Sequence, residues 1–235
     1  MDVAAATARG IPVGHTPDVL TDSTADLAVA LMLAVARRIT EGERLVRAGD
    51  WGIWKPAWML GRDLHAATVG IIGGGRIGSA VARRLEGFGC EVLVSGRRGP
   101  TPLPELLERS DFVSIHVPLS DETRHLIGEP ELRSMKESAY LVNTARGPIV
   151  DQAALATALR RGWIAGAALD VTDPEPLPPG DPLLGAPNLV VIPHLGSATE
   201  RTRAAMAQLA VENLAAGLRG ERMPACVNPE VYEPK

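Results

Sequence analysis

The stretch Thr68-Val-Gly-Ile-Ile-Gly-Gly-Gly-Arg-Ile-Gly78 decides the fold of this 235-residue chain. A short apolar run at 68–72 leads into the turn Gly73-x-Gly75-x-x-Gly78, and a helical pattern follows over 76–86. Strand, glycine turn and helix in this order are typical of the first βαβ unit of a dinucleotide-binding domain. The first glycine permits the tight turn, the second lets a pyrophosphate approach, and the third allows close packing. The alternative is a glycine turn that binds no ligand.

Further apolar runs alternate with helical patterns along the chain. Strands are predicted at 91–95, 111–117, 139–143, 165–170 and 189–192, and helices at 103–109, 152–160 and 199–218. Such alternation indicates a parallel sheet with crossover helices. The predicted fold class is therefore α/β, a Rossmann-type doubly wound parallel sheet. Upstream, residues 22–48 are predicted to form one long helix, and the Trp-rich residues 51–58 a loop that packs locally or contacts another subunit.

The composition argues against several classes of binding partner. Hydrophobic residues make up 46% of the chain and charged residues 22%, which is ordinary for a globular protein. A net charge of −4 without a basic stripe argues against nucleic acid, and the apolar runs are too short to span a membrane. The two cysteines, Cys90 and Cys226, have no metal or redox spacing, so no metal is expected. Reduced thiols and the lack of a signal-peptide pattern predict a cytoplasmic location.

The end of the second strand predicts the cofactor. Enzymes that use NAD usually place an Asp or Glu about 20 residues beyond the glycine turn, where it holds the ribose 2′-hydroxyl. Here the strand ends Val94-Ser95-Gly96-Arg97-Arg98, without a carboxylate. Two arginines would bind a 2′-phosphate through charge-assisted hydrogen bonds. The sequence therefore favours NADPH over NADH, unless both arginines are merely solvated.

Polar residues follow three later strands, and they predict the chemistry. Ligands of open α/β sheets bind beyond the carboxyl ends of the strands. Arg146, Asp170, Glu175 and His194 each lie at such an end, so they are expected to converge near the nicotinamide. Reduction of a 2-keto acid requires a proton donor, an anchor for the carboxylate and a hydride source, which this set and a nicotinamide would supply.

Together these motifs resemble the D-isomer-specific 2-hydroxyacid dehydrogenase family over essentially the whole chain. The glycine turn, Asp111-Phe-Val-Ser-Ile-His-Val-Pro-Leu119 and Asn143-Thr-Ala-Arg-Gly147 carry the resemblance. Trp51-x-x-Trp-Lys-Pro-x-Trp58, Leu169-Asp-Val-Thr-Asp-Pro-Glu-Pro-Leu-Pro178 and Pro193-His-Leu-Gly-Ser-Ala-Thr199 are similar to the members that reduce glyoxylate and hydroxypyruvate. One departure is Gly74, where the family usually carries a larger residue.

The resemblance implies a role for each site residue. Arg146 would hold the substrate carboxylate, His194 would be the general acid in reduction, and Glu175 would keep the imidazole protonated. The alternatives are a structural ion pair for Arg146 and a plain loop carboxylate for Glu175. Asp170 would accept a hydrogen bond from the nicotinamide carboxamide. The implied cofactor contacts are Gly73, Gly75, Arg76, Ile77, Gly78, Ser95, Arg97, Arg98, Val117, Pro118, Thr123, Thr144, Ala145, Asp170 and Gly196.

The reaction implied is NADPH-dependent reduction of glyoxylate and hydroxypyruvate to glycolate and D-glycerate. Two alternatives stay open: a dehydrogenase of another 2-hydroxy acid, such as phosphoglycerate, and a non-catalytic NAD(P)-binding interaction module.

The resemblance also implies a domain organisation and an assembly. Residues 1–19 would be a remnant of a flavodoxin-like substrate domain, residues 20–199 the dinucleotide-binding domain, and residues 200–235 the C-terminal helix and tail of the substrate domain. Most of the substrate domain is expected to be missing, in a fragment or in a natural short form. A homodimer is expected through helix 22–48 and the loop 51–58, with Trp54 reaching toward the active site of the partner.

Overall fold

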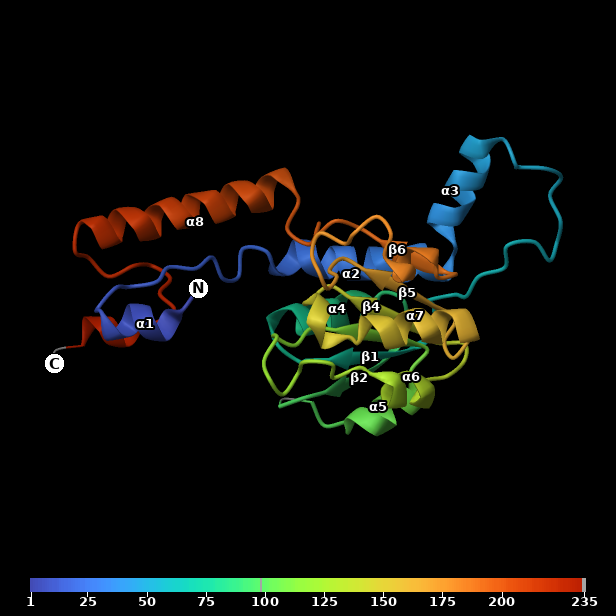
Figure 1. The fold of residues 1–235 in the computed structure, drawn as a ribbon, viewed down its shortest axis with the longest axis horizontal. Coiled ribbons are helices and arrows are strands. Elements are labelled where there is room, and N and C mark those ends of the chain that lie inside the picture. Colours follow the sequence, from blue (N-terminus) through green and yellow to red (C-terminus); the bar gives the residue numbers. More distant parts are fainter. Residues whose placement is uncertain (98, 234–235) are drawn as a thin grey trace. The chain divides into compact units, whose positions relative to one another are not determined.

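The chain forms two compact units in the computed structural model, which describes residues 1–97 and 99–233. One unit spans Thr24–Gly196 and contains the whole sheet, as Figure 1 shows. The other consists of Met1–Ser23 and the described residues from Ser197 onward. None of the described helices is long and apolar enough to cross a membrane.

A six-stranded parallel sheet forms the centre of the larger unit. The strand order is β2-β1-β3-β4-β5-β6, so the direction of winding reverses between β1 and β3. At such a switch point the crossovers leave opposite faces of the sheet and open a crevice at the carboxyl ends. The predicted Rossmann-type fold is confirmed. The strands are β1 (Thr68–Ile72), β2 (Glu91–Ser95), β3 (Phe112–Ile115), β4 (Tyr140–Asn143), β5 (Gly166–Leu169) and β6 (Leu189–Val191).

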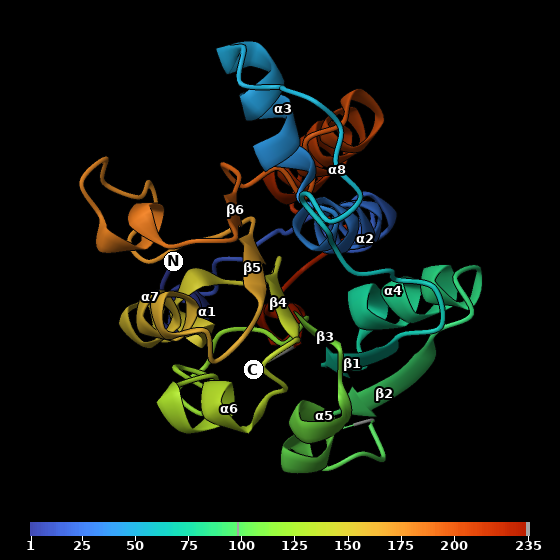
Figure 2. The same ribbon diagram turned by 90° about the vertical axis from the view of Figure 1, so that its right-hand side faces the viewer.

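Helices cover both faces of the sheet (Figure 2). On one face, α2 (Thr21–Ala36) and α4 (Arg76–Glu86) enclose a core around Met32, Val81 and Phe112. On the other face, α5 (Leu103–Arg109), α6 (Glu129–Ser134) and α7 (Gln152–Arg161) enclose a second core. The sequence patterns did not predict α6, because its six residues are too few to show a helical period.

The predicted single helix 22–48 is wrong. The helix breaks after Ala36, Arg38 adopts the left-handed region at φ 52°, and α3 (Ile39–Ala48) begins a new direction. The oxygen of Ala36 accepts a hydrogen bond from the N–H of Arg62 at 2.9 Å, so it is taken by a distant segment. Gly61 permits this approach, because a Cβ there would overlap with the same oxygen. The sequence pattern missed the break because the apolar period continues through Ile39.

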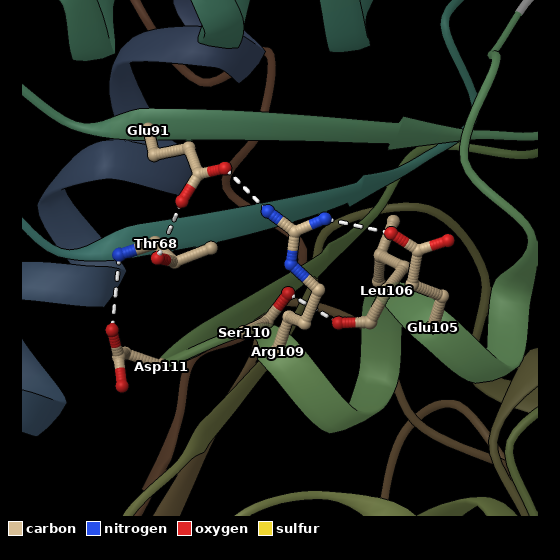
Figure 3. A network of polar contacts seen from close by, with 7 residues as sticks. All are labelled: Thr68, Glu91, Glu105, Leu106, Arg109, Ser110 and Asp111. Carbon is tan, nitrogen blue, oxygen red and sulfur yellow. Dashed lines mark hydrogen bonds and ion pairs between the residues drawn. The ribbon is translucent and has the colours of Figure 1, made fainter.

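A polar network fixes the amino edge of the sheet (Figure 3). Arg109, at the end of α5, pairs with Glu91 and Glu105 at 2.6 Å each. Thr68 donates its hydroxyl to Glu91 at 3.2 Å and its N–H to Asp111 at 2.9 Å. Exposed pairs of this kind stabilise a fold only slightly. They join the starts of β1 and β2 to α5, at the edge opposite the carboxyl ends.

The smaller unit is built from the two ends of the chain. It contains α1 (Val3–Ala8), α8 (Glu200–Leu218) and the 3₁₀ helix Pro229–Tyr232. Two buried asparagines hold it together: the Asn228 side chain accepts from the N–H of Val13 at 2.7 Å, and that of Asn213 donates to the oxygen of His15 at 2.9 Å. Its assignment to a substrate domain stays a prediction.

Gly61→Ala should destabilise the chain, because the new Cβ would collide with the Ala36 oxygen and disturb the Arg62 bond. We expect a loss of about 1–3 kcal/mol in the free energy of unfolding, measured by urea denaturation. Gly52→Ala is the matched control: its Cβ would meet no described atom within 4 Å, and it should change stability by less than about 0.5 kcal/mol. Equal denaturation midpoints for the two variants would contradict this explanation of the helix break.

Candidate active site

The glycine turn follows β1 and leads directly into α4. A Cβ on Gly73 would lie 2.7 Å from the main-chain carbon of His116, and one on Gly78 would overlap with the oxygen of Gly73. A Cβ on Gly75 would instead meet no described atom within 4 Å. Gly75 is also the N-cap of α4, so no side chain of the described residues caps this helix. The open space at a helix N-terminus fits a pyrophosphate. Two further predicted cofactor contacts are the first two residues of this helix, the exposed Arg76 and the half-buried Ile77.

The end of β2 lies beside this turn. The N–H of Gly73 donates to the oxygen of Ser95 at 2.9 Å, and Ser95 is buried. Gly96 follows in a left-handed conformation at φ 117°, and Arg97 is exposed. Arg98, the other predicted contact here, lies outside the described residues. Among the described residues that directly follow β2, the charged one is thus the cation Arg97, and none is a carboxylate.

The loop after β3 contains three more predicted contacts. Val117 is half-buried and Pro118 is exposed. The Thr123 hydroxyl donates to the oxygen of Pro118 at 2.7 Å and accepts from the N–H of Ser120 at 2.8 Å. Thr123 thus shapes the loop in this structure, and its contact with a cofactor stays a prediction.

His116 precedes this loop and is interpreted as structural. Its N–H donates to the oxygen of Ile72 at 2.7 Å, and its ring nitrogen Nε2 lies 2.9 Å from the Ser114 hydroxyl. Burial lowers the pKa of His116 to about 4. The ring is therefore neutral at physiological pH and supports the carboxyl edge without adding charge.

The turn after β4 presents Arg146. The Asn143 side chain accepts from the N–H of Ala145 at 3.0 Å and donates to the oxygen of Arg146 at 2.9 Å. Arg146 is exposed, donates to the oxygen of Ala145 at 2.6 Å, and pairs with no carboxylate of the described residues. A structural ion pair is therefore not observed in the described part of the chain. The Thr144 hydroxyl oxygen is buried without a hydrogen-bond partner there.

The segments after β5 and β6 bring Glu175 and His194 together. The Nδ1 atom of His194 lies 2.5 Å from Oε1 of Glu175, although 19 residues separate the two. Both side chains are partly exposed, at 48% for His194 and 39% for Glu175, so solvent and small molecules can reach them. A carboxylate at Nδ1 sets the proton on that nitrogen and leaves Nε2 for other partners. The interpretation of Glu175 as a plain loop carboxylate does not account for this contact.

Asp170 contacts the turn that contains the same histidine. Its carboxylate accepts from the N–H of Leu195 at 2.5 Å and from the N–H of Gly196 at 2.8 Å. Burial raises the pKa of Asp170, and the two N–H bonds and nearby His194 oppose that shift. The sequence predicted a carboxamide contact for Asp170, which stays a prediction, and did not predict its bonds to Leu195 and Gly196.

Two supporting residues were missed from the sequence. Asn143 could have been found, because an asparagine after a strand commonly closes a turn through its side chain. Thr24 could not: its hydroxyl donates to the oxygen of Gly196 at 3.2 Å across 172 residues. No group of three or more His, Cys, Asp or Glu side chains in the described residues could hold a metal ion.

Comparison with known proteins places the chain in a family. The family model of the D-isomer-specific 2-hydroxyacid dehydrogenase NAD-binding domain matches residues 29–196. The chain belongs to this family. The dehydrogenase is 54% identical to a glyoxylate reductase of Korarchaeum cryptofilum, over 99% of this chain and 74% of the relative. The members of the family use a nicotinamide dinucleotide, and this site fits one at the open space over Gly75 and at the orphaned Thr144 hydroxyl.

Solved structures agree with the dehydrogenase fold. A crystal structure of a Thermus thermophilus protein has a TM-score of 0.91 at 52% identity, and covers 97% of this chain and 75% of its own. The NADPH-dependent glyoxylate/hydroxypyruvate reductase of Sinorhizobium meliloti, solved with NADP and malonate, has a TM-score of 0.89 at 38% identity, and covers 100% of this chain and 76% of its own. The dehydrogenase thus spans about 74–76% of the length of these proteins.

Proposed function

We propose that this dehydrogenase reduces glyoxylate and hydroxypyruvate to glycolate and D-glycerate, with NADPH as the reductant. The observation that carries the proposal is the contact of 2.5 Å between His194 and Glu175 at the carboxyl edge of the sheet. The names of the relatives from K. cryptofilum and S. meliloti support the substrate class.

The chain's own residues supply the general acid and the group that binds the substrate carboxylate. The bound nicotinamide supplies a hydride for C2 of the keto acid. His194 donates the proton at Nε2 to the carbonyl oxygen on C2, while Glu175 stabilises the imidazolium through Nδ1. Arg146, which has no carboxylate partner among the described residues, binds the substrate carboxylate through its guanidinium and orients the C2 carbonyl. Hydride and proton together convert this carbonyl to the hydroxyl, and His194 is left neutral.

His194→Ala should lower kcat for glyoxylate reduction about 10²–10⁴-fold, since the proton donor is lost. The Kd for NADPH, followed by its fluorescence, should stay within about twofold, because no cofactor contact is assigned to this side chain. His65→Ala is the matched control: His65 contacts the oxygen of Phe88 and precedes β1, at the opposite edge. It should keep full activity. Near-normal turnover of His194→Ala would refute the proposed acid.

We propose NADPH rather than NADH, because Ser95, Gly96 and Arg97 place no carboxylate where the ribose 2′-position would lie. Arg97→Ala should raise KM for NADPH about tenfold, equal to about 1.4 kcal/mol, and leave KM for NADH nearly unchanged. The control is Arg161→Ala, an exposed arginine at the end of α7. A lower KM for NADH than for NADPH in the unaltered chain would contradict this preference.

We also propose a homodimer, through α3 and the loop 51–58. None of the ten residues of α3, all described, is buried, and Trp51, Ile53 and Trp54 are 64–85% exposed. A monomer rarely leaves such an apolar patch in water. Helix α2 is packed against its own sheet, so the interface is assigned to α3 and the loop rather than to the whole segment 22–48.

Sedimentation at micromolar concentration should give twice the chain mass, and Ile53→Ser with Trp54→Ser should shift the chain toward monomer. The control is Leu184→Ser, which removes an exposed leucine from another part of the larger unit. A monomer for the unaltered chain would count against the dimer.

A further inference from the structure

The main chain at His194 has an unusual conformation. Its φ is +52°, in the left-handed region that residues other than glycine rarely adopt. The ring reaches Glu175 from this backbone position. A relaxation of φ to the ordinary range would swing the imidazole away from its partner. Something in the surroundings must therefore hold the turn 194–196.

Asp170 makes three hydrogen bonds to that turn. Its main-chain oxygen accepts from the N–H of His194 at 2.9 Å. Its carboxylate oxygens accept from the next two N–H groups, Oδ1 from Leu195 at 2.5 Å and Oδ2 from Gly196 at 2.8 Å. Asp170 is 1% exposed, so water does not compete for these bonds. Asp170, directly after β5, thus accepts from three consecutive N–H groups, and the N–H of His194 is also shared with the oxygen of Ile192 at 3.1 Å.

We propose that Asp170 is a positioning residue that holds the left-handed turn at His194, with Thr24 as its second support. This inference rests on the proposed role of His194 as the general acid. Asp170 acts through the main chain, not by touching the substrate.

Thr24 also contacts this turn. Its hydroxyl, on α2, donates to the oxygen of Gly196 at 3.2 Å, and Thr24 is 5% exposed. Gly196 lets both supports approach, because a Cβ there would lie 3.1 Å from Oδ2 of Asp170 and 3.3 Å from the Thr24 hydroxyl. The turn is therefore tied by hydrogen bonds to the residue that follows β5 and to α2.

This assignment differs from a cofactor-binding role for Asp170 in a measurable way. A carboxamide ligand would affect the affinity for the nicotinamide cofactor. A positioning residue would affect turnover, since a displacement of about 1 Å of a reacting group costs roughly 100-fold in rate. The exchange of the Leu195 and Gly196 amide protons reports separately whether the Asp170 carboxylate holds the turn.

Asp170→Asn tests the assignment, because its NH₂ group replaces one of the two oxygens that accept these N–H bonds. We expect kcat for glyoxylate to fall about ten- to hundredfold, with a Kd for NADPH within about threefold of the unaltered chain. Amide hydrogen exchange at Leu195 and Gly196 should accelerate at least about tenfold, as expected when a local structure opens more often. Thr24→Val should show the same pattern more weakly.

The matched control is Asp151→Asn. Asp151 also accepts two main-chain N–H bonds, from Ala153 and Ala154 at 3.0 Å each, but it caps α7. Asp151→Asn should keep kcat and the amide exchange at Leu195 and Gly196 unchanged, because the bonds it disturbs lie at the start of α7.

A large rise in Kd with kcat preserved in Asp170→Asn would overturn the positioning role and favour the cofactor role. Unchanged exchange at Leu195 and Gly196 would overturn it as well. If the unaltered chain reduced no 2-keto acid, the proposed function would fail, and the exchange rates would still decide whether Asp170 holds the turn.

Discussion

Parallel pairing of the six strands is the constraint on which the rest of this structure depends. It places the carboxyl ends of all six strands on one edge of the sheet. Residues that are distant in the sequence therefore lie along the same edge. Gly73, Ser95, His116, Thr144 and Asp170 each lie at such an end. The amino edge, by contrast, carries ordinary exposed ion pairs such as Arg109 with Glu91. Ligand chemistry belongs at the carboxyl edge because the main chain there has left the sheet and its groups are available.

The loops at this edge are held by polar side chains rather than by apolar packing. Asn143 closes the turn that presents Arg146, and Asp170 with Thr24 holds the turn that presents His194. The bonds come from buried or half-buried residues, where an unmade hydrogen bond is costly. A catalytic group on such a loop keeps its direction although the loop has no regular secondary structure. Because these buried hydrogen bonds hold the main chain of the turns, the side chains of Arg146 and His194 can remain exposed to a ligand.

Most of the fold follows from local patterns in the sequence. The runs 68–72 and 91–95 match β1 and β2 at both ends, and a glycine, Gly73 or Gly96, directly follows each of them. The break after Ala36 could not be predicted, since it depends on a hydrogen bond from Arg62 rather than on any residue nearby. The contact of Glu175 with His194 was anticipated from the family motifs. The hydrogen bonds from Leu195 and Gly196 to the Asp170 carboxylate were not anticipated, because neither bond has a recognisable sequence pattern.

We propose that the carboxyl edge of the sheet assembles a site for hydride transfer to a 2-keto acid. The most direct test of this proposal is a single-turnover reaction of the 235-residue chain with NADPH deuterated at the transferable C4 position and hydroxypyruvate, analysed by mass spectrometry. The site described here predicts D-glycerate that carries one deuterium at C2. NADPH bound to the protein, with no deuterium in any 2-hydroxy acid product, would contradict it.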